Sequence, residues 1–328
     1  MDGGSEQGIL EKTNNMLFIK KCILALFCIL SIHFSYGQER PKEYDDLITK
    51  ALALYMAKDY KASGFAYSSA FKVNDWKGSA DDRYNAACAW ALANYPDSAF
   101  FNLERISTKS GYKDYNHIIT DEDLTSLHND KRWQPLLDLI KKNKEKAEIN
   151  LNKPLALQLD SIYSNDQNNR LKSQDIEKKF GSNSKEMIAL WGTINKTDSI
   201  DLIKVKFILD KYGWLGEDVI GEKGNSTLFL VIQHADLKTQ ETYLPMMKKA
   251  VEKGNALPSQ LALLVDRIEM RNERPQIYGS QVIGQDGKYS FYKIIDEPNV
   301  NKRRAEVGLE PLDRYAKFWN IDYKVPER

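Results

Sequence analysis

Apolar residues recur every three or four positions along most of the chain, which is the spacing of helices that bury one face. From residue 41 to residue 149 this spacing continues with almost no strand-like alternation. It begins again after Lys153 and Pro154, where a proline suits the first turn of a new helix. A chain of 328 residues also exceeds the length at which a single core usually stops growing. The pattern therefore predicts a mainly α-helical protein with two domains, residues 41–149 and 154–328.

Two pairs of helical segments in the first domain repeat at a fixed separation. Aligning Ala51 with Ala87 also aligns Ser63 with Ala99, because each pair is 36 residues apart. Small residues at such positions let two antiparallel helices approach closely. The pattern resembles tetratricopeptide repeats, whose period is about 34 residues. This resemblance implies a helical-repeat domain over residues 41–149 that binds an unknown protein or peptide, a role we favour over a purely structural one.

One stretch of the second domain departs from the helical pattern. Residues 276–283 and 288–294 alternate between apolar and polar side chains on either side of Asp286 and Gly287, a pair typical of tight hairpin turns. The alternation predicts a β-hairpin over residues 276–294 in an otherwise mostly helical domain. Gly279, inside the first predicted strand, suggests that another backbone or a ligand approaches closely there.

The amino-terminal region has the order of a secretory signal. Lys20 and Lys21 precede an apolar run from Cys22 to Phe34, and small residues at 35–37 suit a cleavage site. We therefore predict a signal peptide over residues 16–37, preceded by a non-structural extension over residues 1–15. The apolar run is shorter than the roughly 20 residues that span a bilayer, so no stable membrane span is expected after cleavage. The predicted location is exported, either periplasmic or secreted.

Charge and cysteine content exclude several classes of protein. Lysine and arginine number 47 against 46 acidic residues, so the net charge of +1 provides no long-range attraction for nucleic acid, and no nucleic-acid partner is expected. Two of the three cysteines, Cys22 and Cys28, lie in the predicted signal peptide, which leaves Cys88 and rules out an internal disulfide scaffold. Cys88 lies among alanines and is expected to be a buried small residue. His117 and His128 have no partner at metal-ligand spacing, so neither a metal nor another cofactor is indicated.

Polar residues gather where two apolar helices of the second domain are predicted to end. His234 follows the apolar run 228–232, and Asp266 and Arg267 follow the run 261–265. Charged groups in such places lower stability unless they are paired, which makes them candidates for a functional site. The candidate catalytic residues are His234 and Asp266, and the candidate ligand-binding residues are Asp166, Gln167, Arg170, Gln233, Asp236, Arg267, Gln276, Tyr278 and Gln281.

Several short blocks in the second domain occur in a distinctive combination. They are Asp166-Gln167 with Arg170, Tyr212-Gly213-Trp214, Gln233-His234-Ala235-Asp236, Asp266-Arg267-Ile268, residues 276–281, and Arg304 with Val307-Gly308-Leu309. Together they resemble a bacterial family known only as a domain of unknown function. The resemblance covers roughly Leu155 to Phe318, half of the chain, and it implies no activity.

Two functions remain open at this point. The protein is an exported binding or scaffold module with a recognition pocket for a small polar ligand, or it is an enzyme of the hydrolase type. In the enzyme, His234 is the general base, Asp236 or Asp266 orients it, and Arg267 with Gln276 and Gln281 holds an anionic or amide-bearing substrate. The familiar serine-hydrolase and zinc-protease motifs do not occur in the sequence, which favours the binding module.

Overall fold

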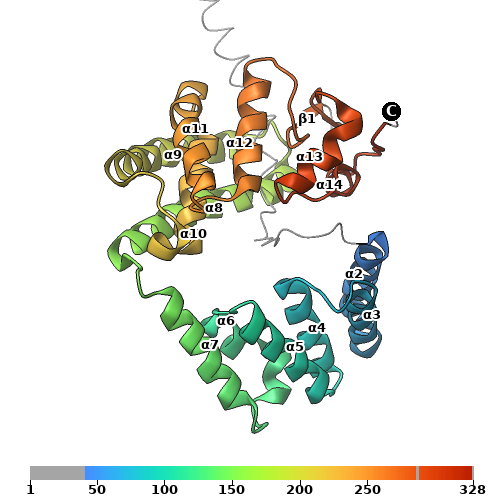
Figure 1. Cartoon of the computed structure of the whole chain (residues 1–328). Helices are drawn as coiled ribbons and strands as arrows, with labels where there is room; N and C mark the ends of the chain where they lie inside the picture. Colours follow the sequence, from blue (N-terminus) through green and yellow to red (C-terminus); the bar gives the residue numbers. More distant parts are fainter. Residues whose placement is uncertain (1–40, 286–287, 327–328) are drawn as a thin grey trace, which may run out of the picture. The chain divides into compact units, whose positions relative to one another are not determined.

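The computed structural model describes residues 41–285 and 288–326 (Figure 1). The predicted signal peptide, the extension before it and the Asp286-Gly287 turn lie outside the described residues. Helices make up most of the described chain, and its one sheet has two strands. The predicted mainly α fold with a single β-hairpin is therefore confirmed.

The described residues form two compact units that divide between Asn150 and Leu151. The helices of the first unit are α2 (Lys42–Met56), α3 (Tyr60–Val73), α4 (Ala80–Leu92), α5 (Pro96–Lys109), α6 (Tyr115–Thr120), the 3-10 helix η2 (Glu122–Leu127) and α7 (Trp133–Ala147). The helices and strands of the second unit are α8 (Lys153–Phe180), α9 (Lys185–Tyr212), α10 (Glu217–His234), α11 (Leu237–Glu252), α12 (Pro258–Arg271), β1 (Val282–Gln285), β2 (Lys288–Phe291), η3 (Glu297–Asn299), α13 (Val300–Glu306) and α14 (Leu312–Phe318).

In the first unit, consecutive helices pack as hairpins, α2 against α3 and α4 against α5 (Figure 1). Asp59 and Ser79 cap α3 and α4 by accepting hydrogen bonds from backbone N–H groups in the first turn. The small residues allow close approach, since a Cβ added at Gly64 would lie 2.6 Å from the Trp90 ring, and Ser63 donates to the Ala51 carbonyl across the hairpin. The likeness of these hairpins to tetratricopeptide repeats stays a prediction.

In the second unit, five long helices, α8 to α12, enclose the largest apolar core of the described chain. Leu159, Ile208, Leu228, Phe229 and Leu264 lie in this core. Because α10 is apolar on every side from residue 228 to residue 232, neighbouring helices must cover it, and α8, α9, α11 and α12 all contact it. This packing places the side chain of His234, the last residue of α10, in the interior of the unit.

One local prediction for the second unit is wrong in detail. The first strand of the hairpin begins at Val282 rather than Gln276, so residues 276–281 form a loop. Gly279 lies in that loop at φ +71°, and a Cβ added there would lie 3.0 Å from the side chains of Ile294 and Leu312.

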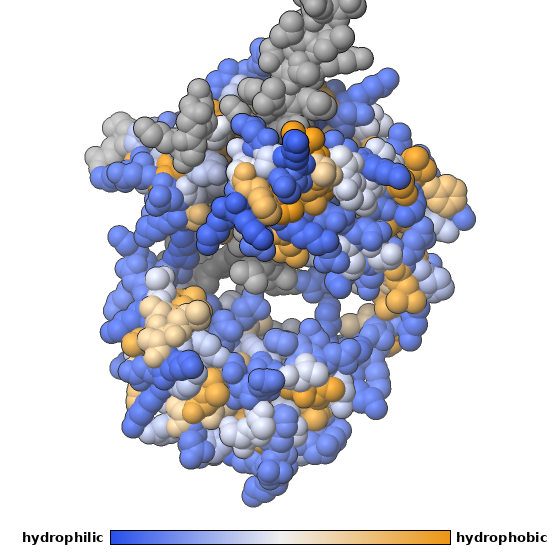
Figure 2. Space-filling view, turned by 180° about the vertical axis from the view of Figure 1, so that it is seen from behind, coloured by the Kyte–Doolittle hydropathy of each residue, from blue (hydrophilic) through white to orange (hydrophobic). Residues whose placement is uncertain are grey.

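No helix in the described ranges is both long and apolar enough to cross a bilayer. The face of the molecule in Figure 2 is mostly hydrophilic, with small hydrophobic patches between the polar side chains. Exposed apolar residues are therefore interspersed with polar ones on that face.

Candidate functional site

Four polar side chains from three helices meet in the second unit. Asp166 and Arg170 come from α8, Asp198 from α9, and His234 is the last residue of α10. Asp166 and Arg170 lie four residues apart and therefore on the same face of α8. His234 reaches them because the apolar turns before it are packed between neighbouring helices. We call this group the histidine cluster.

Arg170 is the centre of the histidine cluster. Its Nη2 lies 2.9 and 2.8 Å from the two carboxylate oxygens of Asp198, and 3.1 Å from Asp166 Oδ1. His234 Nδ1 is 2.9 Å from the same Asp166 oxygen and 2.8 Å from Arg170 Nη2. Gln167 Nε2 donates to the other oxygen of Asp166 at 2.6 Å. The guanidinium of Arg170 therefore lies between the carboxylates of Asp166 and Asp198. The imidazole of His234 contacts both Arg170 and Asp166.

Burial makes these contacts energetically important. The side chains of Arg170, Asp166 and His234 are 4%, 5% and 5% exposed, whereas that of Asp198 is 26% exposed. Removing one partner from a buried ion pair usually costs about 3–5 kcal/mol, because the other charge stays buried without compensation. Asp198 is thus the member of the cluster that is most open to solvent.

The protonation states follow from these surroundings. Burial and the nearby Arg170 lower the pKa of His234, although Asp166 and Asp198 act in the opposite direction, so the imidazole is neutral at pH 7. Burial alone would raise the pKa of Asp166, but His234 and Arg170 outweigh it and hold that pKa well below its usual value. Burial raises the pKa of Asp198, against the effect of Arg170.

A neutral imidazole carries one proton, and we assign it to His234 Nδ1. This places an N–H group against the carboxylate of Asp166, which gives a charge-assisted hydrogen bond. Arg170 keeps acceptors in both carboxylates. His234 Nε2 then carries the lone pair, and Asp166 fixes the orientation of the ring.

Two buried atoms of the histidine cluster lack a hydrogen-bond partner. Among the described residues, neither Arg170 Nη1 nor His234 Nε2 has a partner. An unsatisfied buried polar group typically costs about 1–3 kcal/mol. Arg170 Nη1 is a donor, and His234 Nε2 is an acceptor when the ring proton is on Nδ1.

Asp266 does not orient His234, which corrects the sequence-based expectation. It is fully buried, and it accepts hydrogen bonds from the backbone N–H groups of Ile277 at 2.7 Å, Tyr278 at 3.0 Å and Ser280 at 2.9 Å. Burial raises the pKa of Asp266, and the three N–H groups oppose that rise. Asp266 therefore organises the loop of residues 276–281.

Two of the predicted ligand-binding glutamines, Gln276 and Gln281, belong to the same loop. Gln276 Nε2 donates to the carbonyls of Gln281 at 3.0 Å and Tyr292 at 2.8 Å, and its Oε1 accepts from the Gln281 backbone N–H at 2.7 Å. Gln281 Nε2 donates to Ser280 Oγ at 3.0 Å. Both side chains are buried, and both form hydrogen bonds with other groups of the protein.

The remaining predicted residues also have internal partners. Arg267 is almost fully buried and lies close enough to Tyr315 to interact with it electrostatically. The carbonyl of the half-buried Tyr278 accepts from a guanidinium of α13. Gln233 is fully buried and its carbonyl accepts from Gln240 Nε2 at 2.8 Å. Asp236 is exposed and caps α11 through the Thr239 N–H at 2.7 Å, so it does not orient His234 either.

Sequence reasoning missed two important residues. Asp198 lies inside α9, and an acidic residue inside an apolar helical pattern is itself a signal for a buried partner. Arg304, fully buried in α13, donates to the carbonyls of Tyr278 at 2.7 Å and Glu310 at 2.5 Å. Arg304 belongs to one of the blocks noted in the sequence. Because a buried guanidinium needs hydrogen-bond acceptors, Arg304 was a reasonable further candidate.

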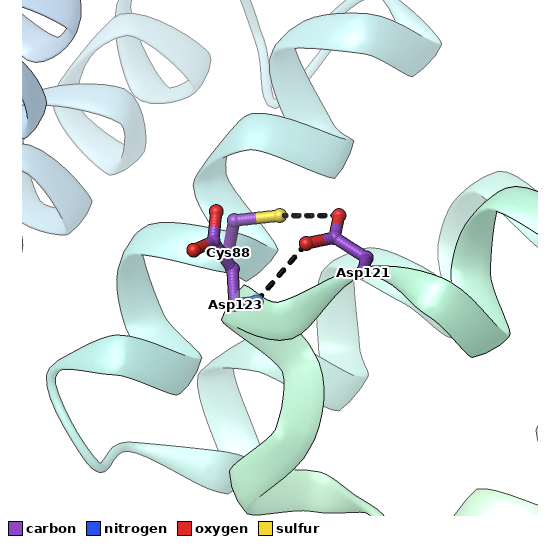
Figure 3. A group of neighbouring side chains, drawn as sticks. All are labelled: Cys88, Asp121 and Asp123. Atoms are coloured by element: carbon purple, nitrogen blue, oxygen red, sulfur yellow. Dashed lines mark hydrogen bonds between the residues drawn. The ribbon is translucent and has the colours of Figure 1, made fainter.

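Among the described residues of the first unit, three side chains with potential metal-ligand atoms lie close together, as Figure 3 shows. Ligand atoms of Cys88, Asp121 and Asp123 lie within 4.8 Å of one another. Asp121 Oδ2, however, accepts from the Tyr84 hydroxyl at 2.8 Å and from Cys88 Sγ at 3.7 Å, and Asp123 accepts from Tyr55. Burial raises the pKa of the Cys88 thiol, which keeps it protonated. These side chains satisfy one another, and we treat the group as a hydrogen-bond network of the core.

Comparisons with known proteins place the second unit in a family. Searches of curated proteins and of solved structures returned no match. One family model matches residues 156–326, a span that holds both the histidine cluster and the loop organised by Asp266. The match covers more than half of the chain, and the chain therefore belongs to DUF6624, a family of unknown function.

Proposed function

We propose that the chain is an exported binding protein whose family domain takes a small polar ligand at the histidine cluster. The observation that supports this proposal is the pair of buried atoms without partners, Arg170 Nη1 and His234 Nε2. Export rests on the signal-like order of residues 16–37. The helical hairpins of the first unit bind a protein or peptide in this proposal, as their likeness to tetratricopeptide repeats suggests.

The chemistry of the two atoms defines the ligand. Arg170 Nη1 needs an acceptor, for which a carboxylate or phosphate oxygen is the strongest choice. His234 Nε2 needs an N–H or O–H donor. A small hydroxy acid or amino acid offers both groups on neighbouring atoms. Asp198 is the most exposed member of the cluster and already holds Arg170, so an anionic ligand has to compete with it.

A hydrolase-type enzyme is the second candidate, and one distance favours it. Asp166 holds His234 Nδ1 at 2.9 Å, which leaves Nε2 as a base of fixed orientation. No side chain among the described residues donates a hydrogen bond to Nε2. Water, or a hydroxyl of the substrate, is therefore the group that His234 would activate, and Arg170 would hold an anionic oxygen of the substrate.

Thermal unfolding with lactate, glycine or inorganic phosphate as probes tests the binding function. A probe present at a hundred times its Kd should raise the free energy of unfolding by about 2.7 kcal/mol. Arg170→Gln should abolish this effect, and Arg274→Gln, which changes an exposed arginine of the same unit, should retain it. Asp198→Asn removes the competing carboxylate and should strengthen binding of lactate and phosphate. The proposal is refuted if no probe stabilises the wild type, or if Arg170→Gln responds as the wild type does.

Hydrolysis of 4-nitrophenyl acetate tests the enzyme. An activated imidazole should release nitrophenol faster than the His234→Gln variant does. His128→Gln is the matched control, because it removes a histidine of the first unit. Equal rates for the wild type and His234→Gln would exclude His234 as a base for ester hydrolysis and leave the binding function standing.

A further inference from the structure

A groove of ≈ 710 Å³ runs along the hairpin of the second unit. None of the residues of the histidine cluster lines this groove. One wall consists of residues 289–294, that is, most of β2 and the residues after it. The other wall consists of residues 319–323, after α14, together with Glu297. Six consecutive residues line the first wall, so residues from both faces of β2 border the groove.

The edge of β2 away from β1 has free backbone groups. Phe291 is opposite Val282 and Ser290 is opposite Ile283 in the antiparallel pair. The N–H of Tyr292 donates to the carbonyl of Gln281, which fixes even-numbered residues of β2 as the ones bonded to β1. The N–H and C=O groups of Tyr289 and Phe291 therefore point away from β1, and the described sheet has no further strand to pair with them.

The free edge ends at a definite place. Gln276 donates its backbone N–H to the Lys293 carbonyl at 2.9 Å and accepts from the Ile295 N–H. Residues from Lys293 onward are thus already covered by Gln276. The available edge extends from Tyr289 to the N–H of Lys293, four residue rises or about 13 Å at roughly 3.3 Å per residue.

The groove has the volume of one short strand. A strand residue occupies about 160 Å³, from a rise of about 3.3 Å, a strand spacing of about 4.8 Å and a sheet thickness of about 10 Å. The groove of ≈ 710 Å³ therefore holds about four such residues. This length agrees with the free edge.

The walls indicate which side chains the occupant carries. Tyr289 packs on Trp319 with ring centroids 5.6 Å apart, and Phe291 packs edge-on to Tyr323 at 5.0 Å. These rings offer apolar surface to alternate side chains of an added strand. Glu297 and Asp322 contribute two carboxylates to the groove, against the single ammonium group of Lys293. The excess negative charge favours a basic residue in the occupant.

We infer that this groove binds an extended peptide segment of a partner protein, which adds to β2 as a third strand. The peptide pairs its backbone with Tyr289 and Phe291, places apolar side chains on the aromatic wall, and carries a lysine or arginine near Asp322. This site is independent of the ligand proposed for the histidine cluster.

Calorimetric titration of the chain from residue 38 onward with a blocked pentapeptide, Val-Lys-Val-Tyr-Val, tests the inference. We expect binding, and no binding of the same peptide with its alternate amides N-methylated. Tyr289→Pro removes one outward N–H and, because that group faces away from β1, leaves the hairpin paired. Tyr289→Ala removes the same ring and keeps the N–H. Tyr289→Pro should bind about fivefold more weakly than Tyr289→Ala, the effect of one hydrogen bond.

Two further measurements complete the test. Asp322→Lys should weaken binding of the lysine-containing peptide. The same variant should bind more tightly a peptide in which glutamate replaces that lysine. Circular dichroism of each variant establishes that it is folded. Equal affinity of the N-methylated peptide, or of Tyr289→Pro and Tyr289→Ala, would overturn strand addition. A dimer of the wild type in sedimentation that Tyr289→Pro abolishes would assign the groove to a second copy of the chain and also overturn the proposal.

Discussion

Asp266→Asn is the sharpest available test of how the loop of residues 276–281 is held. In the wild type, Asp266 Oδ1 accepts from the N–H groups of Ile277 and Tyr278, and Oδ2 accepts from that of Ser280. Asparagine replaces one of these oxygens with an NH2 group. Whichever way the amide turns, at least one buried N–H then faces a donor instead of an acceptor.

The size of the effect follows from counting these N–H groups. Each buried N–H that loses its acceptor costs about 1–3 kcal/mol, so the favourable amide orientation, with nitrogen toward Ser280, predicts a loss of about 1–3 kcal/mol. Asp266→Ala leaves all three N–H groups without an acceptor, which gives about 3–9 kcal/mol, comparable to the whole stability of many domains. The asparagine variant is therefore the useful one, because it should still fold.

The pH dependence gives an independent check. Burial raises the pKa of Asp266, so the folded chain binds this proton more tightly than the unfolded chain does. The contribution of Asp266 to the stability of the wild type should then fall as the pH rises from the unfolded value of about 3.9 through the folded pKa. Asp266→Asn has no such proton, so the difference between the two proteins should narrow over that window.

Urea denaturation and amide hydrogen exchange measure both effects. We expect the amides of Ile277, Tyr278 and Ser280 to exchange faster in Asp266→Asn. Asp175→Asn, which removes an exposed charge from α8, should change stability by less than about 0.5 kcal/mol. A loss below that limit for Asp266→Asn, with unchanged exchange at the three amides, would refute the loop-organising role of Asp266.

Three further substitutions test other parts of the second unit. Burial and Arg170 lower the pKa of His234 below about 6.5, so the free energy of unfolding should fall as the pH decreases below that value, by at most about 1.36 kcal/mol per pH unit. In His234→Gln, the urea midpoint should therefore depend less on pH between pH 7 and pH 5. His128→Gln should keep the pH dependence of the wild type. Gly279→Ala places a Cβ 3.0 Å from Leu312 at a positive φ and should cost about 2–4 kcal/mol in the same urea experiment, whereas a loss below about 1 kcal/mol would show that the loop relaxes. Asp236→Ala removes the cap of α11 and should cost about 1 kcal/mol by thermal melting; an unchanged melting temperature would contradict the capping role.

The fold class could be predicted because it depends on local periodicity. Helical spacing of apolar residues and the Asp286-Gly287 pair were sufficient for a mainly α chain with one hairpin. Boundaries were harder, as the hairpin shows. Residues 276–281 alternate as a strand does, but Gly279 adopts a positive φ and Gln276 turns its side chain back onto the loop, which no alternation pattern records.

The candidate site was predicted only in part, for a related reason. Periodicity places Asp166 and Arg170 on one face of α8, and the apolar run of α10 indicates that His234 is buried. It does not say which faces of different helices meet, so Asp198, 28 residues beyond Arg170, was missed and Asp266 was assigned to the wrong partner. The requirement of a backbone loop for acceptors is also absent from any pattern of side-chain types.

Hydrogen-bond balance now separates two buried groups that look alike in the sequence. The oxygens of Asp266 and the amide of Gln276 form hydrogen bonds with the backbone of residues 276–281. A ligand could therefore bind these groups only by displacing hydrogen bonds that hold the loop. In the histidine cluster, Arg170 Nη1 and His234 Nε2 are left without partners among the described residues. Substitutions around Asp266 should therefore lower stability equally with and without a ligand, whereas Arg170→Gln should also remove the response to lactate or phosphate. If Asp266→Asn abolished that response while the melt remained cooperative, the loop would have to be part of the ligand site, and the separation of the two groups would be wrong.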